Sequence, residues 1–256
     1  MLSVFRSGVL AAMVFAVLGV GRAEWPMLTE EATSLLWGGY SLSIGVGRAD
    51  QDSGDLPGAE GNLWTLPEFH GTLGLGPRAE VSFDYELFYL ERAGHGDVYE
   101  SGDLRLWTKF VLFPGDRQTL SLRFGVKLPN AHDENGLGTD ETDFFASLLY
   151  GARIGAATAT LNAGLGVLGD PERNQQQDDV FTWAAAVRVP VWRALSGAVD
   201  ASGYSGPFGV GRRKDFATFA ALLDWDAGPW RFSGAGRTGV ADAEAWGWVV
   251  GVTYAR

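Results

Sequence analysis

Apolar and polar residues alternate along much of this chain, most regularly on the two sides of an acidic, glycine-containing loop. On one side, residues 119–128 alternate an apolar row with a polar one: Leu120, Leu122, Phe124, Val126 and Leu128 against Ser121, Arg123, Gly125 and Lys127. Residues 142–154 repeat the alternation on the other side. A period of two residues predicts β-strands and not helices. Strands of roughly 9 to 11 residues are long enough to cross a bilayer when they are tilted.

The alternation recurs and predicts about twelve strands, an even number of the kind that single-chain bacterial barrels have. The predicted strands cover residues 35–47, 63–76, 80–89, 102–113, 119–128, 142–154, 157–168, 180–189, 195–204, 214–225, 230–240 and 245–254. In the clearest of them, Val81, Phe83 and Tyr85 alternate with acidic or small polar residues. In residues 63–76 the alternation predicts an outward row of Leu63, Phe69, Leu73 and Leu75.

The connections between these strands alternate between short and long. Turns rich in Gly or Pro occupy residues 76–78, 114–118, 155–156, 190–194 and 226–229, and longer polar links occupy residues 48–62, 92–101, 129–141, 169–179 and 205–213. Short periplasmic turns and long extracellular loops are typical of outer-membrane barrels, whereas a β-sandwich does not predict them. Tryptophans gather near the short turns (Trp192, Trp225 and Trp230) and near the opposite rim (Trp64, Trp183, Trp246 and Trp248), which indicates two aromatic belts.

The predicted fold class is therefore all-β, a transmembrane up-and-down antiparallel β-barrel of about twelve strands formed by residues 35–256. Residues 1–23 have the features of a secretory signal peptide: Arg6, an apolar core at residues 9–20, and the small-x-small site Gly21-Arg22-Ala23. The apolar core is too short for a membrane anchor. Residues 24–34 are predicted to be a short periplasmic lead-in. The predicted location is the cell outer membrane of a Gram-negative bacterium, reached through the inner membrane.

Composition narrows the function classes. The chain contains 36 glycines and ten tryptophans, which suits crowded strand faces and interfacial belts. Its formal net charge is -11, and residues 1–23 carry two arginines and no acid, so nucleic acid is an unsuitable partner. The absence of cysteine excludes disulfides, thiolate metal sites, cysteine nucleophiles and a lipoprotein anchor.

The expected partners are outer-membrane lipid, small-molecule solutes and the barrel assembly machinery. The C-terminal strand is relevant to the last of these. Its apolar row consists of Trp246, Trp248, Val250, Val252 and Tyr254. Outer-membrane proteins commonly finish with an aromatic residue that the assembly machinery recognises. Here Ala255 and Arg256 follow Tyr254, which departs from that pattern.

Residues 127–166 resemble a known family. The resemblance lies in Lys127-Leu128-Pro129, then Asn135-Gly136-Leu137-Gly138-Thr139, then Asp143 in one strand and Asn162-Ala163-Gly164 in the next. These runs are similar to the outer-membrane family labelled MetA-pathway of phenol degradation. The resemblance implies a transport-like barrel that admits small hydrophobic or aromatic compounds, and it brings no catalytic residues.

The charged inward row supplies the candidate site. The predicted pore-lining residues are Glu68, His70, Glu80, Asp84, Glu86, Asp103, Arg105, Lys109, Arg123, Lys127, Asp143, Arg153 and Arg188, with Asp200, Arg231 and Arg237 as further candidates. Opposite charges on opposing walls would set a transverse field across a pore and select polar or zwitterionic solutes. Alternatively, these groups pair across the barrel and close it. The sequence leaves both readings open.

Other motifs carry less weight. The acidic loop at residues 132–141 has oxygen ligands for a divalent cation but lacks the order of a calcium loop, so a solvated loop is favoured. Residues 164–169 match a dinucleotide pattern literally but lie within a strand. His70, His95 and His132 form no His-x-x-x-His pair, and the chain has no Gly-x-Ser-x-Gly elbow. We therefore expect no catalytic residues, no metal and no cofactor.

The sequence thus predicts an outer-membrane channel, similar to porins, for passive uptake of small solutes. The alternative is a non-conducting barrel with a structural or adhesive role and an ion-paired lumen. A barrel lipid hydrolase, with His95 as the rim histidine, ranks below both.

Overall fold

The computed structural model describes residues 25–51, 61–92, 96–132, 137–169, 177–206, 215–240 and 246–256. The predicted signal peptide, His95 and residues 133–136 of the acidic loop lie outside the described residues. No helix with the length and apolar character that a membrane crossing requires is present in the described part of the chain.

The described residues form thirteen strands. Their bounds are β1 (Tyr40–Gln51), β2 (Gly61–Gly76), β3 (Ala79–Arg92), β4 (Val98–Ser101), β5 (Leu104–Phe113), β6 (Gln118–Leu128), β7 (Asp143–Ile154), β8 (Ala157–Gly169), β9 (Gln177–Trp192), β10 (Leu195–Ser205), β11 (Phe216–Ala227), β12 (Trp230–Val240) and β13 (Trp246–Ala255). All predicted strands are present. The first begins at Tyr40 and not at residue 35, and several extend beyond the predicted ends.

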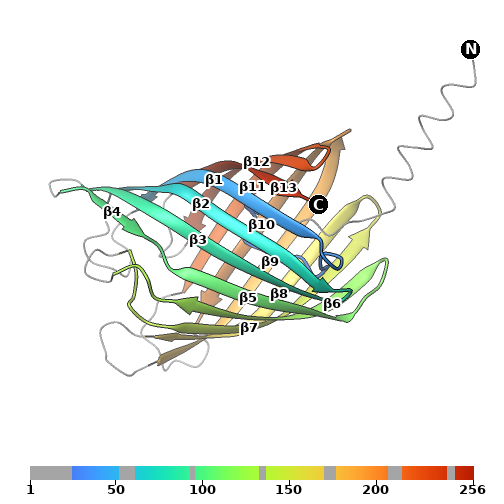
Figure 1. Cartoon of the computed structure of the whole chain (residues 1–256), viewed down its shortest axis with the longest axis horizontal. Helices are drawn as coiled ribbons and strands as arrows, with labels where there is room; N and C mark the ends of the chain where they lie inside the picture. The colour runs from blue at the N-terminus through green and yellow to red at the C-terminus, as the bar shows by residue number, and fades with distance from the viewer. Residues whose placement is uncertain are drawn as a thin grey trace, which may run out of the picture.

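The sheet closes on itself (Figure 1). Neighbouring strands pair antiparallel, and β1 pairs with both β2 and β13, which joins the two ends of the chain. β3 pairs with β5 near the short turns and with β4 further along, so β4 and β5 share one position in the wall. The thirteen strands therefore build a twelve-position barrel, which confirms the predicted fold class.

The interruption between β4 and β5 has a local cause. The Gly102 amide donates a hydrogen bond to the Glu86 carbonyl oxygen at 2.7 Å. The Asp103 carboxylate accepts hydrogen bonds from the amides of Asn130 and Ala131, at 3.0 and 3.1 Å. Because Asp103 binds the link after β6, Gly102 and Asp103 lie outside the ladder. The strand predicted at residues 102–113 therefore begins at Leu104, and β4 lies within residues 92–101, which were predicted to be a link.

Alternate residues face the lumen and the lipid, as the sequence predicts. In β1, Ser41 and Ser43 are 0% and 4% exposed, whereas Leu42 and Ile44 are 54% and 46% exposed. A half-exposed apolar row is unfavourable in water but matches the outward apolar band of a membrane barrel. The burial pattern therefore follows the predicted rows.

Leu63 is an exception, and its prediction as an outward residue is wrong. The register of β1 and β2 shifts, and the pairing of β2 with β3 shifts between Thr65 and Glu68. One extra residue in a strand inverts the faces on its far side. Leu63 is consequently buried between Ala49 and Leu90, and the neighbouring Trp64 faces outward.

Aromatic side chains lie at both ends of the outer surface. Trp183, which was also predicted for the belt near the long links, is among the residues that line the lumen cavity described below. Near the short turns, Trp230 packs edge-on against Tyr254 with ring centroids 4.9 Å apart, and Trp225 stacks on Phe232 at 5.4 Å. Near the long links, Trp64 meets Trp248 edge-on at 6.1 Å. Rings of this kind sit at the level of lipid headgroups, so the two belts mark the membrane boundaries.

Residues 25–39, which we call the lumen strap, precede β1. The part from Trp25 to Leu35 lies inside the barrel, whereas Leu36 and Trp37 are 65% and 77% exposed. Trp25, Thr29, Ala32 and Leu35 are 7%, 1%, 2% and 3% exposed. The sequence predicted residues 24–34 as a lead-in outside the barrel and placed residue 35 in the first strand. The described residues instead cross the lumen before β1 begins.

The wall is shaped to receive the lumen strap. The inward residues that pack with Trp25 are small or aliphatic and come from the last four strands: Ala198, Ala220, Leu222, Ala235 and Val249. Met27 packs against the same cluster. Small side chains on β10–β13 therefore leave the space that the strap fills.

We expect Val199→Arg to destabilise the barrel in lipid by about 2–4 kcal/mol, because Val199 is 62% exposed near the middle of β10 and a charge there must enter hydrocarbon. Val199→Leu is the control and should leave stability nearly unchanged. Urea unfolding in liposomes measures both variants. Equal stability of the two would contradict the lipid-facing assignment.

Candidate functional site

The lumen strap is held to the wall by side chains. Asp200 of β10 accepts hydrogen bonds from the amides of Leu28 and Thr29, at 2.6 and 3.0 Å, and from the Thr29 hydroxyl. Asn162 of β8 accepts from the Glu30 amide at 2.8 Å and donates to the Glu30 carbonyl oxygen at 2.9 Å. Strap backbone groups that would otherwise be buried without partners are thus satisfied.

The Glu30 carboxylate lies between two cations of the wall. Lys109 Nζ is 2.8 Å from Glu30 Oε1, and Arg123 Nη2 is 3.2 Å from Glu30 Oε2. Burial by itself would raise the pKa of Glu30, but the charges of Arg123 and Lys109 outweigh it and lower the pKa from 4.5 to about 2. Glu30 is therefore ionised near neutral pH and belongs to the wall's charge network.

The Trp25 ring packs against the wall at two glycines that leave room for it. Its ring lies over Gly45 and Gly251, which face each other across β1 and β13, and an added Cβ would come within 2.3 Å and 2.4 Å of the ring. The Trp25 indole donates a hydrogen bond to Glu68 at 2.8 Å. Any larger side chain at either glycine would push the ring out of this position.

The predicted charged residues pair mainly with their neighbours. Lys109 is 2.7 Å from Glu80, Arg105 is 2.7 Å from Glu86, and Lys127 lies between Asp143 at 2.8 Å and Asp103 at 3.4 Å. Arg188 pairs with Asp224 of β11. The acidic strands β2 and β3 adjoin the basic strands β5 and β6, so the acids and bases do not face each other from opposing walls as the transverse-field prediction required.

His70 takes part in a buried hydrogen-bonded chain. His70 Nδ1 is 2.6 Å from Asp84, and His70 Nε2 is 3.0 Å from the Thr72 hydroxyl. The order hydroxyl, imidazole, carboxylate is that of a hydrolytic triad. His70 and Thr72 are only 9% and 7% exposed, however, and neither lines the cavity described below. The Trp107 indole donates a hydrogen bond to the other Asp84 oxygen at 2.7 Å, so both oxygens of this carboxylate have donors within the wall.

Arg153 differs from the rest of the predicted set. It belongs to the inward row of β7 by alternation, but it lies next to the short turn before β8 and is exposed. The other twelve predicted residues are at inward positions of the wall, and Arg153 does not line the enclosed lumen.

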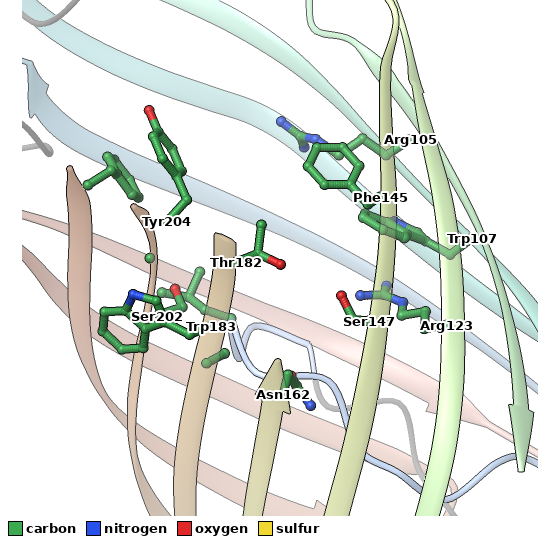
Figure 2. A pocket seen from close by; sticks show the side chains of 14 residues that line it. Arg105, Trp107, Arg123, Phe145, Ser147, Asn162, Thr182, Trp183, Ser202 and Tyr204 are labelled. Carbon is green, nitrogen blue, oxygen red and sulfur yellow. The ribbon is translucent and has the colours of Figure 1, made fainter. Parts of the chain in front are cut away.

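The lumen contains a cavity of about 410 Å³ lined by 14 residues. Figure 2 shows two facing groups: Arg105, Trp107, Arg123, Phe145 and Ser147 on one side, and Thr182, Trp183, Ser202 and Tyr204 on the other. Leu28 of the lumen strap also lines it. None of the lining residues is an Asp or a Glu. The two arginines nevertheless form ion pairs with acids that do not line the cavity, Arg105 with Glu86 and Arg123 with Glu30.

Aromatic rings give this cavity its second property. The Arg123 guanidinium lies 3.8 Å from the centroid of the Trp107 ring, and Trp107 is 5.6 Å from Phe145. On the facing side, Tyr204 stacks on Phe216 at 5.4 Å. The cavity therefore combines two guanidinium groups with two aromatic pairs.

Of the predicted pore-lining residues, Arg105 and Arg123 line this cavity, and the other lining residues were not among those predicted. Trp107 and Phe145 share the inward rows of Arg105 and Asp143 at a spacing of two residues, so the alternation contained the signal. Glu30 and Leu28 lie in a segment without alternation, so their position had no local signal. Asp200, a further candidate in the sequence, proves to be a main anchor of the lumen strap.

Metal binding has no visible support in the described ranges, where no group of three or more His, Asp or Glu side chains is arranged to hold an ion. The loop considered for a divalent cation is described only in part, because residues 133–136 lie outside those ranges. In the described part, His132 pairs with Glu100.

We expect Lys127→Met to destabilise the folded barrel by about 3–5 kcal/mol, because Asp103 and Asp143 would then be buried beside each other without their shared cation. Adding Asp143→Asn should recover part of the loss. Arg78→Met, in the exposed turn between β2 and β3, is the control and should have little effect. Unfolding by urea in detergent measures all three, and a neutral Lys127→Met would contradict the ion-paired network.

Glu30 should titrate far below its ordinary range. Because its pKa is lower in the folded protein than in the unfolded chain, its contribution to stability is fully present above pH 4.5 and is lost as the pH falls through about 2. Carboxyl ¹³C NMR of labelled glutamate can follow the titration. Arg123→Gln should raise the midpoint, and a wild-type midpoint near 4.5 would show that Glu30 is not held by Lys109 and Arg123.

Comparison with known proteins identifies solved structures that have a similar fold. Neither a scan against models of protein families nor a search of curated proteins finds a match. Among solved structures, a COG4313 outer membrane channel from Pseudomonas putida F1 is 14% identical with a TM-score of 0.69, over 88% of this chain and 98% of that chain. The NanC porin is 10% identical with a TM-score of 0.62, over 83% and 98%.

The KdgM porin is 9% identical, with a TM-score of 0.57 over 84% of this chain and 98% of that chain. At such identities the similarity establishes the architecture only. The family suggested by residues 127–166 stays a prediction, and the chain has the fold of the outer-membrane β-barrels.

Proposed function

We propose that this protein is an outer-membrane channel for the passive uptake of small solutes. The observation that carries the proposal is the cavity inside the barrel, whose lining combines guanidinium groups, small polar side chains and aromatic rings. Its volume of about 410 Å³ falls within the range of roughly 300–1,000 Å³ that small-molecule sites have. The solved structures with a similar fold include an outer membrane channel and two porins, which supports the same function.

The preferred solutes are small aromatic compounds that carry a negative charge. Arg105 and Arg123 present guanidinium groups, which bind carboxylates through paired hydrogen bonds. Trp107, Phe145, Tyr204 and Phe216 present ring surfaces on both sides of the same space. Because no acidic side chain lines the cavity, an anion bound there would contact the arginines directly and would not contact a carboxylate.

The alternative, a non-conducting barrel with a structural or adhesive role, has one observation in its favour. The lumen strap and the ion pairs of β3, β5 and β6 fill much of the interior on the side of the short turns. A permanently filled lumen would conduct no ions. Conductance measurements separate the two functions directly.

In planar bilayers we expect discrete conductance steps from the purified protein, and benzoate should reduce the current more than acetate or benzyl alcohol, because benzoate has both a ring and a carboxylate. Arg105→Gln should weaken the benzoate effect roughly tenfold, since a charge-assisted hydrogen bond contributes about that much to binding.

Arg231→Gln is the matched control, because Arg231 pairs with Asp226 near a short turn and does not line the cavity. Its benzoate response should equal that of the wild type. Equal responses to benzoate and acetate would refute the aromatic preference, and silence of correctly folded protein under all conditions would favour the non-conducting barrel.

A further inference from the structure

The lumen strap crosses the passage that the proposed channel requires. It contacts inward residues of strands far apart around the wall: Glu68 on β2, Glu80 on β3, Lys109 on β5, Ser121 on β6, Asn162 on β8 and Asp200 on β10. A segment with partners on so many sides spans the lumen and does not merely coat one wall. Solutes that pass through the barrel must therefore pass the strap.

The strap is attached to the wall by side-chain contacts that can break without disrupting the sheet. Its contacts from Trp25 to Leu35 are made by side chains of the wall, and among the described residues the first backbone-to-backbone hydrogen bonds to a strand are at Gly38 and Gly39, both with Gly74. Releasing the strap would thus break no part of the sheet ladder. Segments held in this way open locally without global unfolding.

The end of the strap has the features of a hinge. Gly38 has a φ of 71°, and no atom lies within 4 Å of the position where its Cβ would be. This positive φ is a conformation that glycine adopts readily, and glycine is also the residue with the most freedom to leave it. The backbone from residue 40 onward is fixed in β1 by its partners on β2 and β13.

Release also leaves the main cations of the wall with partners. Lys109 keeps Glu80 at 2.7 Å, and Arg123 keeps its position 3.8 Å from the Trp107 ring. Asp200 changes most, because its three described hydrogen bonds all go to Leu28 and Thr29 of the strap and it is 3% exposed. Asp200 is therefore the wall residue that contributes most to holding the strap in the lumen.

We propose that the lumen strap is a gate that turns about Gly38 and Gly39, closes the channel when Asp200 holds it, and opens the channel when it leaves the lumen. The gate rests on the proposed channel function. The predicted signal cleavage after Ala23 would leave the strap with a free end, which withdrawal of the strap requires.

A disulfide can lock the gate without other changes, because the chain contains no cysteine. A Cβ built on Gly151 of β7 would lie 3.3 Å from the Ala32 Cβ, close to the Cβ separation of roughly 3.5–4.5 Å in disulfides. The double variant Ala32→Cys, Gly151→Cys should remain closed in planar bilayers when oxidised and regain wild-type openings after reduction.

Opening can be followed separately from conduction. Ala32 is 2% exposed, so the thiol of the single variant Ala32→Cys should react slowly with a membrane-impermeant maleimide. Adding Asp200→Ala should raise the labelling rate and the open probability roughly tenfold, because a carboxylate that accepts several hydrogen bonds is removed. Asp226→Ala is the control, because the described side-chain bonds of Asp226 go to Arg231 near a short turn. It should leave both the labelling rate and the open probability unchanged.

The outcomes distinguish the gate from the channel. Labelling and conductance that respond to neither Asp200→Ala nor the disulfide overturn the gate, and they leave the channel standing if wild-type protein conducts. Faster labelling without any current in Asp200→Ala overturns the channel, and with it the gating role, while showing that the strap does leave. Folding of each variant is checked by heat-modifiable migration in gels.

Discussion

The pairing of every backbone amide and carbonyl group within the sheet is the constraint on which the rest of this structure depends. Hydrocarbon offers no hydrogen-bond partners, so a sheet that crosses a membrane must have no free edge. The antiparallel pairing of β1 with β13 meets this requirement, because it joins the first strand to the last. Once the wall is closed, each strand must divide its side chains between lipid and lumen.

The lumen that results is not uniform. On β3, β5 and β6, inward acids and bases alternate between neighbouring strands and satisfy one another, as in Glu80 with Lys109. On β10–β13, inward positions are mostly small or aliphatic, and Trp25 and Met27 pack there. A closed barrel has one interior to fill, and here ion pairs fill one side while the lumen strap fills the space that small residues leave on the other.

This arrangement also explains the character of the cavity. Arg105 and Arg123 face open space, while Glu86 and Glu30 hold them from the wall and from the strap. The acids orient the guanidinium groups without lining the cavity themselves. The strap therefore has two effects on the proposed passage: it narrows the lumen, and through Glu30 it helps to set the position of Arg123.

The sequence by itself determined the twelve strand positions of the barrel wall, most of the lipid-facing rows and most of the inward charged residues, because side-chain alternation is a local property that each strand displays independently. It did not predict the short strand β4. It did not reveal the inverted face at Leu63, since the shift in register depends on how β2 pairs with its neighbours. Only the tertiary structure placed residues 25–35 inside the barrel. Their partners, such as Asp200 and Asn162, lie more than a hundred residues away in the chain, and a segment without periodicity carries no local record of such contacts.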